Sequence, residues 1–145
     1  MEKVTNILLR KPPPFNTVLP TCSIDDALHQ MQCENVDHLI VLDGNAFLGI
    51  LSDHDITTKV IFANRPLTLV YVKEIMNTKL PMATTDDSIE RCMRLMRQFN
   101  VRFMPVFEDR TFKGVISVDD IIQEAIFYRE AIFDVVKDDR PNAMA

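Results

Sequence analysis

The sequence predicts an α/β (α+β) fold in which two tandem β-α-β-β-α repeats pack with pseudo-twofold symmetry. Three observations predict it: the chain matches itself at an offset of 65 residues, apolar spacing changes in the same order in both copies, and 145 residues suffice for one core. The match contains 11 identities over the 34 positions from 23 to 56. We expect repeats at 1–65 and 66–136 and a flexible tail at 137–145. Neither half has enough residues for a robust core, so the halves should pack together.

Each copy contains an amphipathic helix that follows a serine. Ser23 and Ser88 suit the N-cap position, where a side-chain oxygen accepts a free backbone N–H. Apolar residues then recur at i, i+3, i+4 and i+7, which places them on one helix face. These residues are Ile24, Ala27, Leu28 and Met31 in the first copy and Ile89, Cys92, Met93 and Met96 in the second.

Two short apolar runs follow each helix and predict a hairpin. The runs are 38–42 with 47–51 and, in the second copy, 103–107 with 112–116, and each pair is joined by a polar turn. Pro105 predicts that its strand lies at an edge, or that its backbone nitrogen faces a cleft, because proline donates no ladder hydrogen bond.

A closing helix is predicted after each hairpin, at about 53–62 and at about 118–128 or beyond. A second, weaker match lies upstream of the two helices. Residues 4–8 resemble residues 72–76, once a length difference of three residues before the helices is allowed for. The closing helix of the second copy is apolar on more than one side, which suggests burial against another chain.

Composition excludes several classes of function. The formal charge of −5 leaves no broad basic field, so we expect no nucleic-acid partner. Apolar runs stay short of the roughly 18 to 20 residues of a membrane helix, so we expect no membrane partner and a cytoplasmic location. The three cysteines form no Cys-x-x-Cys pair, and we read them as small apolar residues, not as a disulfide framework or a zinc site.

The same motif ends both hairpins. Gly49–Ile56 and Gly114–Ile121 share the pattern Gly-apolar-apolar-Ser-x-x-Asp-Ile, which passes from a strand into a helix. A serine hydroxyl near free helix N–H groups suits a phosphate, and the aspartate can accept hydrogen bonds from two ribose hydroxyls. The alternative is a simple N-capping box without a ligand, which two copies in register make less attractive.

The doubled motif resembles the cystathionine-β-synthase (CBS) domain family over about residues 4 to 128. That resemblance implies a Bateman module, in which two repeats leave two clefts for adenosine-containing ligands. It further implies that Asp55 and Asp120 bind ribose, and that Ser52 and Ser117 lie near phosphate.

The resemblance also makes the two clefts unequal. A strand of the family often directs a basic side chain at the phosphates, and its position holds Arg102 in the second copy but Asp37 in the first. Asp37 would repel phosphate, although His38 could compensate if protonated. We therefore expect nucleotide in a cleft containing Asp120 and Arg102 before the one containing Asp55, while the sequence leaves open which repeat supplies which cleft wall.

The predicted function is a regulatory sensor of an adenosine nucleotide (AMP, ADP or ATP), with S-adenosylmethionine or NADH as further candidates and no catalytic cofactor. We expect a homodimer that signals to an unidentified regulated protein. One alternative is a structural dimerisation or interaction module whose clefts stay empty. An enzyme is less favoured, because Cys22, Cys33 and Cys92 have no motif partner for nucleophilic catalysis and His29 is expected to face solvent. A metal site at Asp53, His54 and Asp55 is disfavoured because neighbouring helical residues point in different directions.

Overall fold

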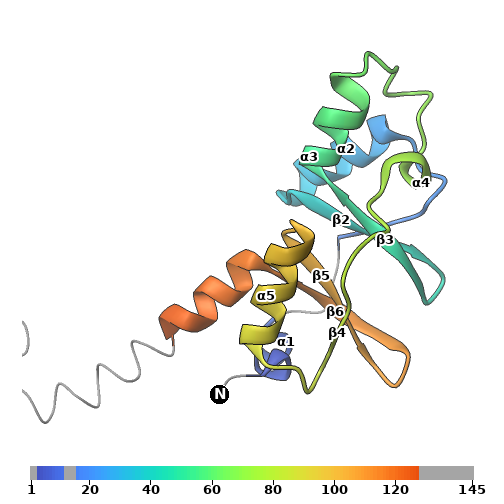
Figure 1. The fold of residues 1–145 in the computed structure, drawn as a ribbon. Coiled ribbons are helices and arrows are strands. Elements are labelled where there is room, and N and C mark those ends of the chain that lie inside the picture. Colours follow the sequence, from blue (N-terminus) through green and yellow to red (C-terminus); the bar gives the residue numbers. More distant parts are fainter. Residues whose placement is uncertain (1–2, 12–15, 128–145) are drawn as a thin grey trace, which may run out of the picture.

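The computed structural model describes residues 3–11 and 16–127. The predicted tail at 137–145, and any part of the closing helix beyond 127, lie outside the described residues. Figure 1 shows two halves, each with a small sheet and its helices. The elements are α1 Val4–Arg10, β1 Thr17–Val18, α2 Ile24–Glu34, β2 His38–Asp43, β3 Ala46–Ser52, α3 Asp53–Ile56, η1 Thr57–Ile61, α4 Val72–Ile75, β4 Ala83–Thr84, α5 Ile89–Phe99, β5 Phe103–Glu108, β6 Thr111–Ser117 and a helix at 118–127.

The predicted β-α-β-β-α order is confirmed in both halves, and a short helix precedes each copy. These helices, α1 and α4, explain the match between 4–8 and 72–76. Ser23 and Ser88 cap α2 and α5 as expected, accepting hydrogen bonds from the backbone N–H of Asp26 and Arg91. Within the described part of the chain, no helix is long and apolar enough to cross a membrane.

The two sheets have the same topology. The first has the order β1-β2-β3 and the second β4-β5-β6, with a parallel pair followed by an antiparallel hairpin in each. Their registers match at the offset of 65 residues, since His38 pairs with Ser52 and Phe103 with Ser117. Both hairpins also shift register at equivalent positions, after Val41 and after Val106.

The edge position considered for Pro105 is wrong, because β5 is the central strand of its sheet. Pro105 pairs with Val115 of β6, whereas β4 begins to pair with β5 only at Val106. The proline nitrogen therefore lies just before the parallel ladder starts, where no ladder hydrogen bond is required.

The two leading helices each pack on the opposite half. Val4 and Ile7 of α1 are buried in the core of the second half with Ile89 and Met104. Val72 and Ile75 of α4 are buried in the core of the first half with α2, β2 and β3. Figure 1 shows α1 beside β4, β6 and α5. The packed units therefore differ from the sequence repeats, and α1 carries its flanking residues into the second half.

A third apolar cluster joins the two sheets. Its buried members are Ile40, Ile50, Phe103 and Val115. Residues that are equivalent in the two repeats face each other here: the rings of His38 and Phe103 stack with centroids 4.2 Å apart, and those of Phe47 and Phe112 with centroids 4.9 Å apart. Contacts between equivalent residues are what a twofold axis requires, so the predicted pseudo-twofold packing is confirmed.

Candidate functional site

The two Ser-x-x-Asp motifs lie where β3 and β6 end. Ser52 Oγ accepts a hydrogen bond from the Asp55 backbone N–H at 3.1 Å, and Asp55 Oδ2 accepts from the Ser52 hydroxyl at 2.9 Å and from its backbone N–H at 3.3 Å. In the second motif the Asp120 N–H donates to Ser117 Oγ at 3.0 Å, and the Ser117 N–H donates to Asp120 Oδ2 at 2.8 Å. Both motifs are thus N-caps, and the caps hold each carboxylate at the end of its sheet.

The two motif glycines each lie close to a residue from another segment: Asn77 beside Gly49, and Leu8 beside Gly114. A Cβ atom on Gly49 would lie 2.7 Å from the Asn77 carbonyl oxygen, and one on Gly114 would lie 3.2 Å from the Leu8 side chain. Asn77 in turn exchanges two backbone hydrogen bonds with Ile50, at 2.8 and 3.1 Å. Gly49 therefore permits the close approach that places Asn77 beside the first motif.

An open cleft of about 320 Å³ lies between the two repeats. The first repeat contributes the end of β3 and the start of α3, and the second contributes the turn between α5 and β5. The lining residues are Ile50, Ser52, Asp53, His54, Asp55, Asn77, Leu80, Asn100, Val101, Arg102 and Phe103. Three predicted site residues, Ser52, Asp55 and Arg102, therefore share one cleft.

The expected pairing of Arg102 with Asp120 is not what the structure shows. Arg102 lines the cleft of Asp55. Its carbonyl oxygen accepts a hydrogen bond from the Val118 N–H at 3.0 Å, which keeps its backbone beside its own motif. Because Phe103 packs between the two sheets, the residue before it reaches the border between the repeats and borders the cleft of the other copy. Spacing within one repeat could not reveal this crossing.

Asp55 is largely buried, and a lysine from its own helix accompanies it. Lys59 Nζ lies 3.1 Å from Asp55 Oδ1 and donates to the Ile75 carbonyl oxygen of α4 at 3.0 Å. Lys59 does not line the open cleft. The positive charge of Lys59 therefore offsets the negative charge of Asp55 from outside the cleft. Ser52 and Asp55 themselves line the cleft.

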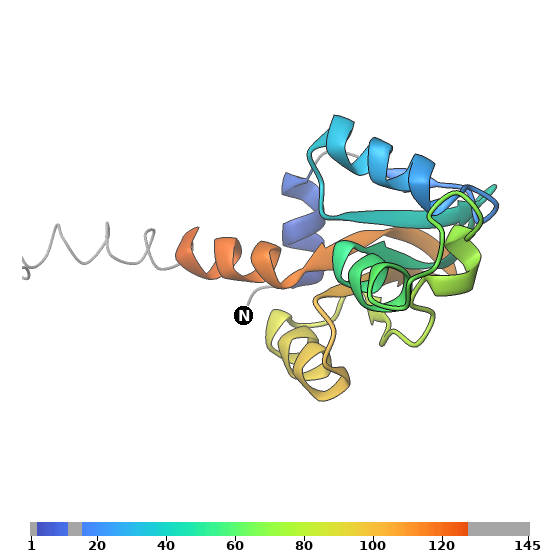
Figure 2. The same cartoon turned by 90° about the horizontal axis from the view of Figure 1, so that it is seen from above.

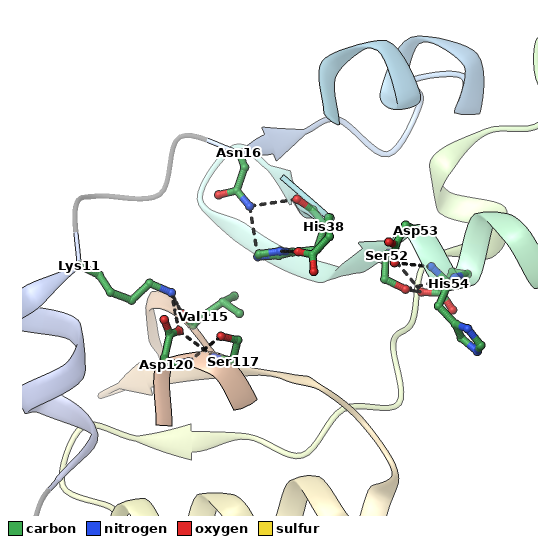
Figure 3. Close-up of polar contacts among 11 residues, drawn as sticks. Lys11, Asn16, His38, Ser52, Asp53, His54, Val115, Ser117 and Asp120 are labelled. Atoms are coloured by element: carbon green, nitrogen blue, oxygen red, sulfur yellow. Dashed lines mark hydrogen bonds and ion pairs between the residues drawn. The ribbon is translucent and has the colours of Figure 1, made fainter. Parts of the chain in front are cut away.

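Asp120 meets a different lysine, which sequence reasoning missed. Lys11 Nζ lies 2.8 Å from Asp120 Oδ2 and 2.8 Å from the Val115 carbonyl oxygen (Figure 3). Lys11 follows α1, so it reaches the second motif only because α1 packs on the second half. No local pattern in the sequence indicated this contact.

His38 occupies a separate polar cluster. Its Nδ1 lies 3.0 Å from Asp37 Oδ1, and its Nε2 lies 3.2 Å from the side-chain nitrogen of Asn16 (Figure 3). The Asn16 side chain also donates to the His38 carbonyl oxygen at 3.1 Å. His38 is thus in contact with Asp37, as its proposed compensating role requires, but it does not line the open cleft. Its role as a ligand contact stays a prediction.

The cysteines and the potential metal ligands form a separate set of side chains. Over residues 3–11 and 16–127, no group of three His, Cys, Asp or Glu side chains could hold a metal ion. All three cysteines are free, and Cys92 is buried in the second core, as expected for a small apolar residue. Burial, followed by the nearby Asp87 carboxylate, raises the pKa of the Cys92 thiol to about 11.

Comparison with known proteins identifies the repeated unit. The family model described as CBS domain matches the chain twice, at residues 4–61 and 72–126. A relative from Arabidopsis thaliana, the mitochondrial CBS domain-containing protein CBSX3, is 28% identical over 109 residues. That match covers 72% of this chain and 53% of the relative, so the chain spans about half the length of this relative.

Solved structures share the fold. A protein with CBS domains from Burkholderia ambifaria is 30% identical, with a TM-score of 0.80 and coverage of 86% of this chain and 94% of that one. The CBS domain pair of protein MJ0100, solved in complex with 5′-methylthioadenosine and S-adenosyl-L-methionine, is 26% identical with a TM-score of 0.73. That comparison covers 90% of this chain and 98% of that one.

Proposed function

Since this chain belongs to the CBS-domain family, in which a pair of repeats forms a regulatory module, we propose that it senses an adenosine-containing ligand. One observation carries the proposal: the cleft places Ser52 and Asp55 of one repeat with Arg102 of the other. A ligand that bridges these groups would bind differently as the two repeats move. Such differential affinity is the physical requirement for a sensor.

The lining of the cleft matches the parts of a nucleoside. Ile50, Leu80 and Phe103 offer apolar surface for a purine ring. Asp55 can accept hydrogen bonds from the ribose hydroxyls, as acidic residues do in dinucleotide folds. Arg102 can pair with a phosphate or carboxylate through its guanidinium group. We therefore assign Asp55 to ribose, with Arg102 and Ser52 toward the phosphate.

Volume and charge favour a small ligand among the candidates. About 320 Å³ is at the small end of the roughly 300–1,000 Å³ of ligand pockets. Among the described residues that line the cleft, Arg102 is the only Lys or Arg, and these residues also include the carboxylates of Asp53 and Asp55. A triphosphate would meet too little positive charge. AMP and S-adenosylmethionine, whose sulfonium is cationic, therefore fit better than ATP or NADH.

A ligand panel tests the proposal. AMP, ADP, ATP, S-adenosylmethionine, 5′-methylthioadenosine and NADH are added in turn, and thermal unfolding of the chain is recorded. A ligand at about 100 times its dissociation constant should stabilise the fold by roughly 2.7 kcal/mol and raise the melting temperature by several degrees. If none of these compounds shifts the melting temperature, the proposal fails and the alternative of an interaction module with empty clefts is favoured. Recovery of each compound intact after long incubation checks the prediction that the chain is not an enzyme.

We further propose a homodimer formed through helix faces. The 118–127 helix extends from the body of the molecule (Figure 2), and Ile122, Ile126 and Phe127 on it are about half exposed. Ile61 and Phe62, at the end of η1, add exposed apolar surface. Light scattering should give twice the 16.7 kDa mass of the chain, and Ile126→Glu should give the monomer mass. A monomer at all concentrations would overturn this assembly.

The cytoplasmic location and the regulated partner stay predictions.

A further inference from the structure

We infer that Lys11 blocks the second nucleotide position, so that the module binds one adenosine ligand per chain and not two. This inference rests on the proposed function and concerns its stoichiometry. The inferred stoichiometry departs from the twofold symmetry of the repeats. Lys11 contacts the second motif, whereas its counterpart in the second repeat, Lys79, does not line the cleft at the first motif.

Lys11 contacts the equivalents of cleft-lining residues. Ile50, Ser52 and Asp55 line the open cleft, and an offset of 65 residues turns them into Val115, Ser117 and Asp120. The Lys11 ammonium donates to the carbonyl oxygen of Val115 and to the carboxylate of Asp120, both at 2.8 Å. Figure 3 shows the lysine side chain directed at this pair of groups. The ammonium thus contacts two residues whose counterparts in the first repeat line the open cleft.

One oxygen of the Asp120 carboxylate, Oδ2, accepts from both internal partners. Asp120 Oδ2 accepts from Lys11 and from the Ser117 N–H, each at 2.8 Å. Ribose hydroxyls that bind Asp120 Oδ2 would have to displace a charged donor, which makes a stronger hydrogen bond than a neutral hydroxyl. The ion pair is partly buried, since the Lys11 and Asp120 side chains are 34% and 22% exposed, so solvent screens it only in part.

The first motif also has a lysine ion pair, but that lysine lies outside the open cleft. Lys59 reaches Asp55 Oδ1 from one helical turn further along and donates to α4, outside the open cleft. The counterpart of Lys11 is Lys79, because Val4 corresponds to Val72. Lys79 is exposed and does not line the cleft. Beside Ile50 the chain instead places the backbone of Asn77, which leaves Asp55 at the cleft wall.

Calorimetric titration with AMP and, separately, with 5′-methylthioadenosine tests the inference. The full chain should bind one molecule of each active probe. Lys11→Met removes the charge but keeps an apolar side chain of similar length, and it should bind two, with second-site affinity raised by roughly tenfold or more. Lys79→Met removes an equal charge at the counterpart position and should still bind one. Far-ultraviolet circular dichroism checks that each variant is folded, and Lys11→Gln replaces Lys11→Met if the latter is not.

The outcomes separate this inference from the proposed function. Two molecules bound by the unaltered chain, or one bound by both it and Lys11→Met, would overturn the blockade and leave the nucleotide sensor standing. Weaker binding in Lys11→Met would assign Lys11 to the ligand contacts and also overturn it. Absence of binding in every chain would overturn the proposed function itself.

Discussion

At the scale of single residues, we propose that Arg102 decides whether the cleft recognises a phosphate. Replacing it with methionine should weaken AMP binding by roughly ten- to hundredfold, because a hydrogen bond to a charged group contributes about 1.5–3 kcal/mol. Binding of 5′-methylthioadenosine, which has no phosphate, should change little. Arg94→Met, at an exposed position on α5, is the matched control. Equal losses for both ligands, measured by calorimetric titration, would contradict the assignment of Arg102 to phosphate.

The cysteines offer a second test at this scale, because their surroundings differ. Cys33 is exposed, whereas Cys92 is buried and burial raises its pKa from 9.0 to about 11. The reactive species is the thiolate, so at pH 8 iodoacetamide should modify Cys33 quickly and Cys92 only on unfolding. Mass spectrometry of peptides after timed alkylation measures both rates. Comparable alkylation rates for Cys33 and Cys92 in the native protein would show that the second core is more accessible to solvent than in this structure.

At the scale of elements, the exchange of α1 and α4 between the halves has a measurable consequence. Ile7 of α1 is 3% exposed within the second core, whereas Leu9 on the same helix is 81% exposed. Ile7→Ala should reduce the free energy of unfolding by about 2–5 kcal/mol, and Leu9→Ala by about 0.5 kcal/mol or less. Chemical denaturation measures both values.

Hydrogen exchange then locates the effect of Ile7→Ala. Because α1 packs on the second half, amide exchange should accelerate more in α5 and β5 than in α2 and β2. Acceleration confined to α2 and β2 would mean that α1 packs on its own repeat. The same result would remove the reason for Lys11 to lie beside Asp120.

The elements themselves could be predicted from the sequence because their signals are local. Ser23 and Ser88 were predicted as caps, and the registers of the two hairpins follow the same offset that aligned the sequence. Pro105 was harder, because a proline is tolerated in a central strand where the neighbouring strand has not yet begun to pair. That depends on where β4 starts, which no residue near Pro105 reveals.

At the scale of the whole molecule, sequence reasoning named three residues of the open cleft but favoured a different grouping of them. Ser52, Asp55 and Arg102 were all candidates, yet Arg102 was expected beside Asp120 and lines the cleft of Asp55 instead. Lys11 was not a candidate at all. Both differences arise from contacts between the repeats. The spacing of residues within one repeat does not reveal which residues of the other repeat they contact. We therefore propose that the ligand binds at the first motif.

A matched pair of substitutions tests this placement most directly. Asp55→Asn and Asp120→Asn make the same change at equivalent positions and retain an oxygen that can accept the capping hydrogen bond. Equilibrium dialysis with radiolabelled AMP and 5′-methylthioadenosine measures binding to each. We predict that Asp55→Asn weakens binding by at least roughly tenfold while Asp120→Asn leaves it unchanged. Loss of binding in Asp120→Asn, with binding retained in Asp55→Asn, would contradict the account.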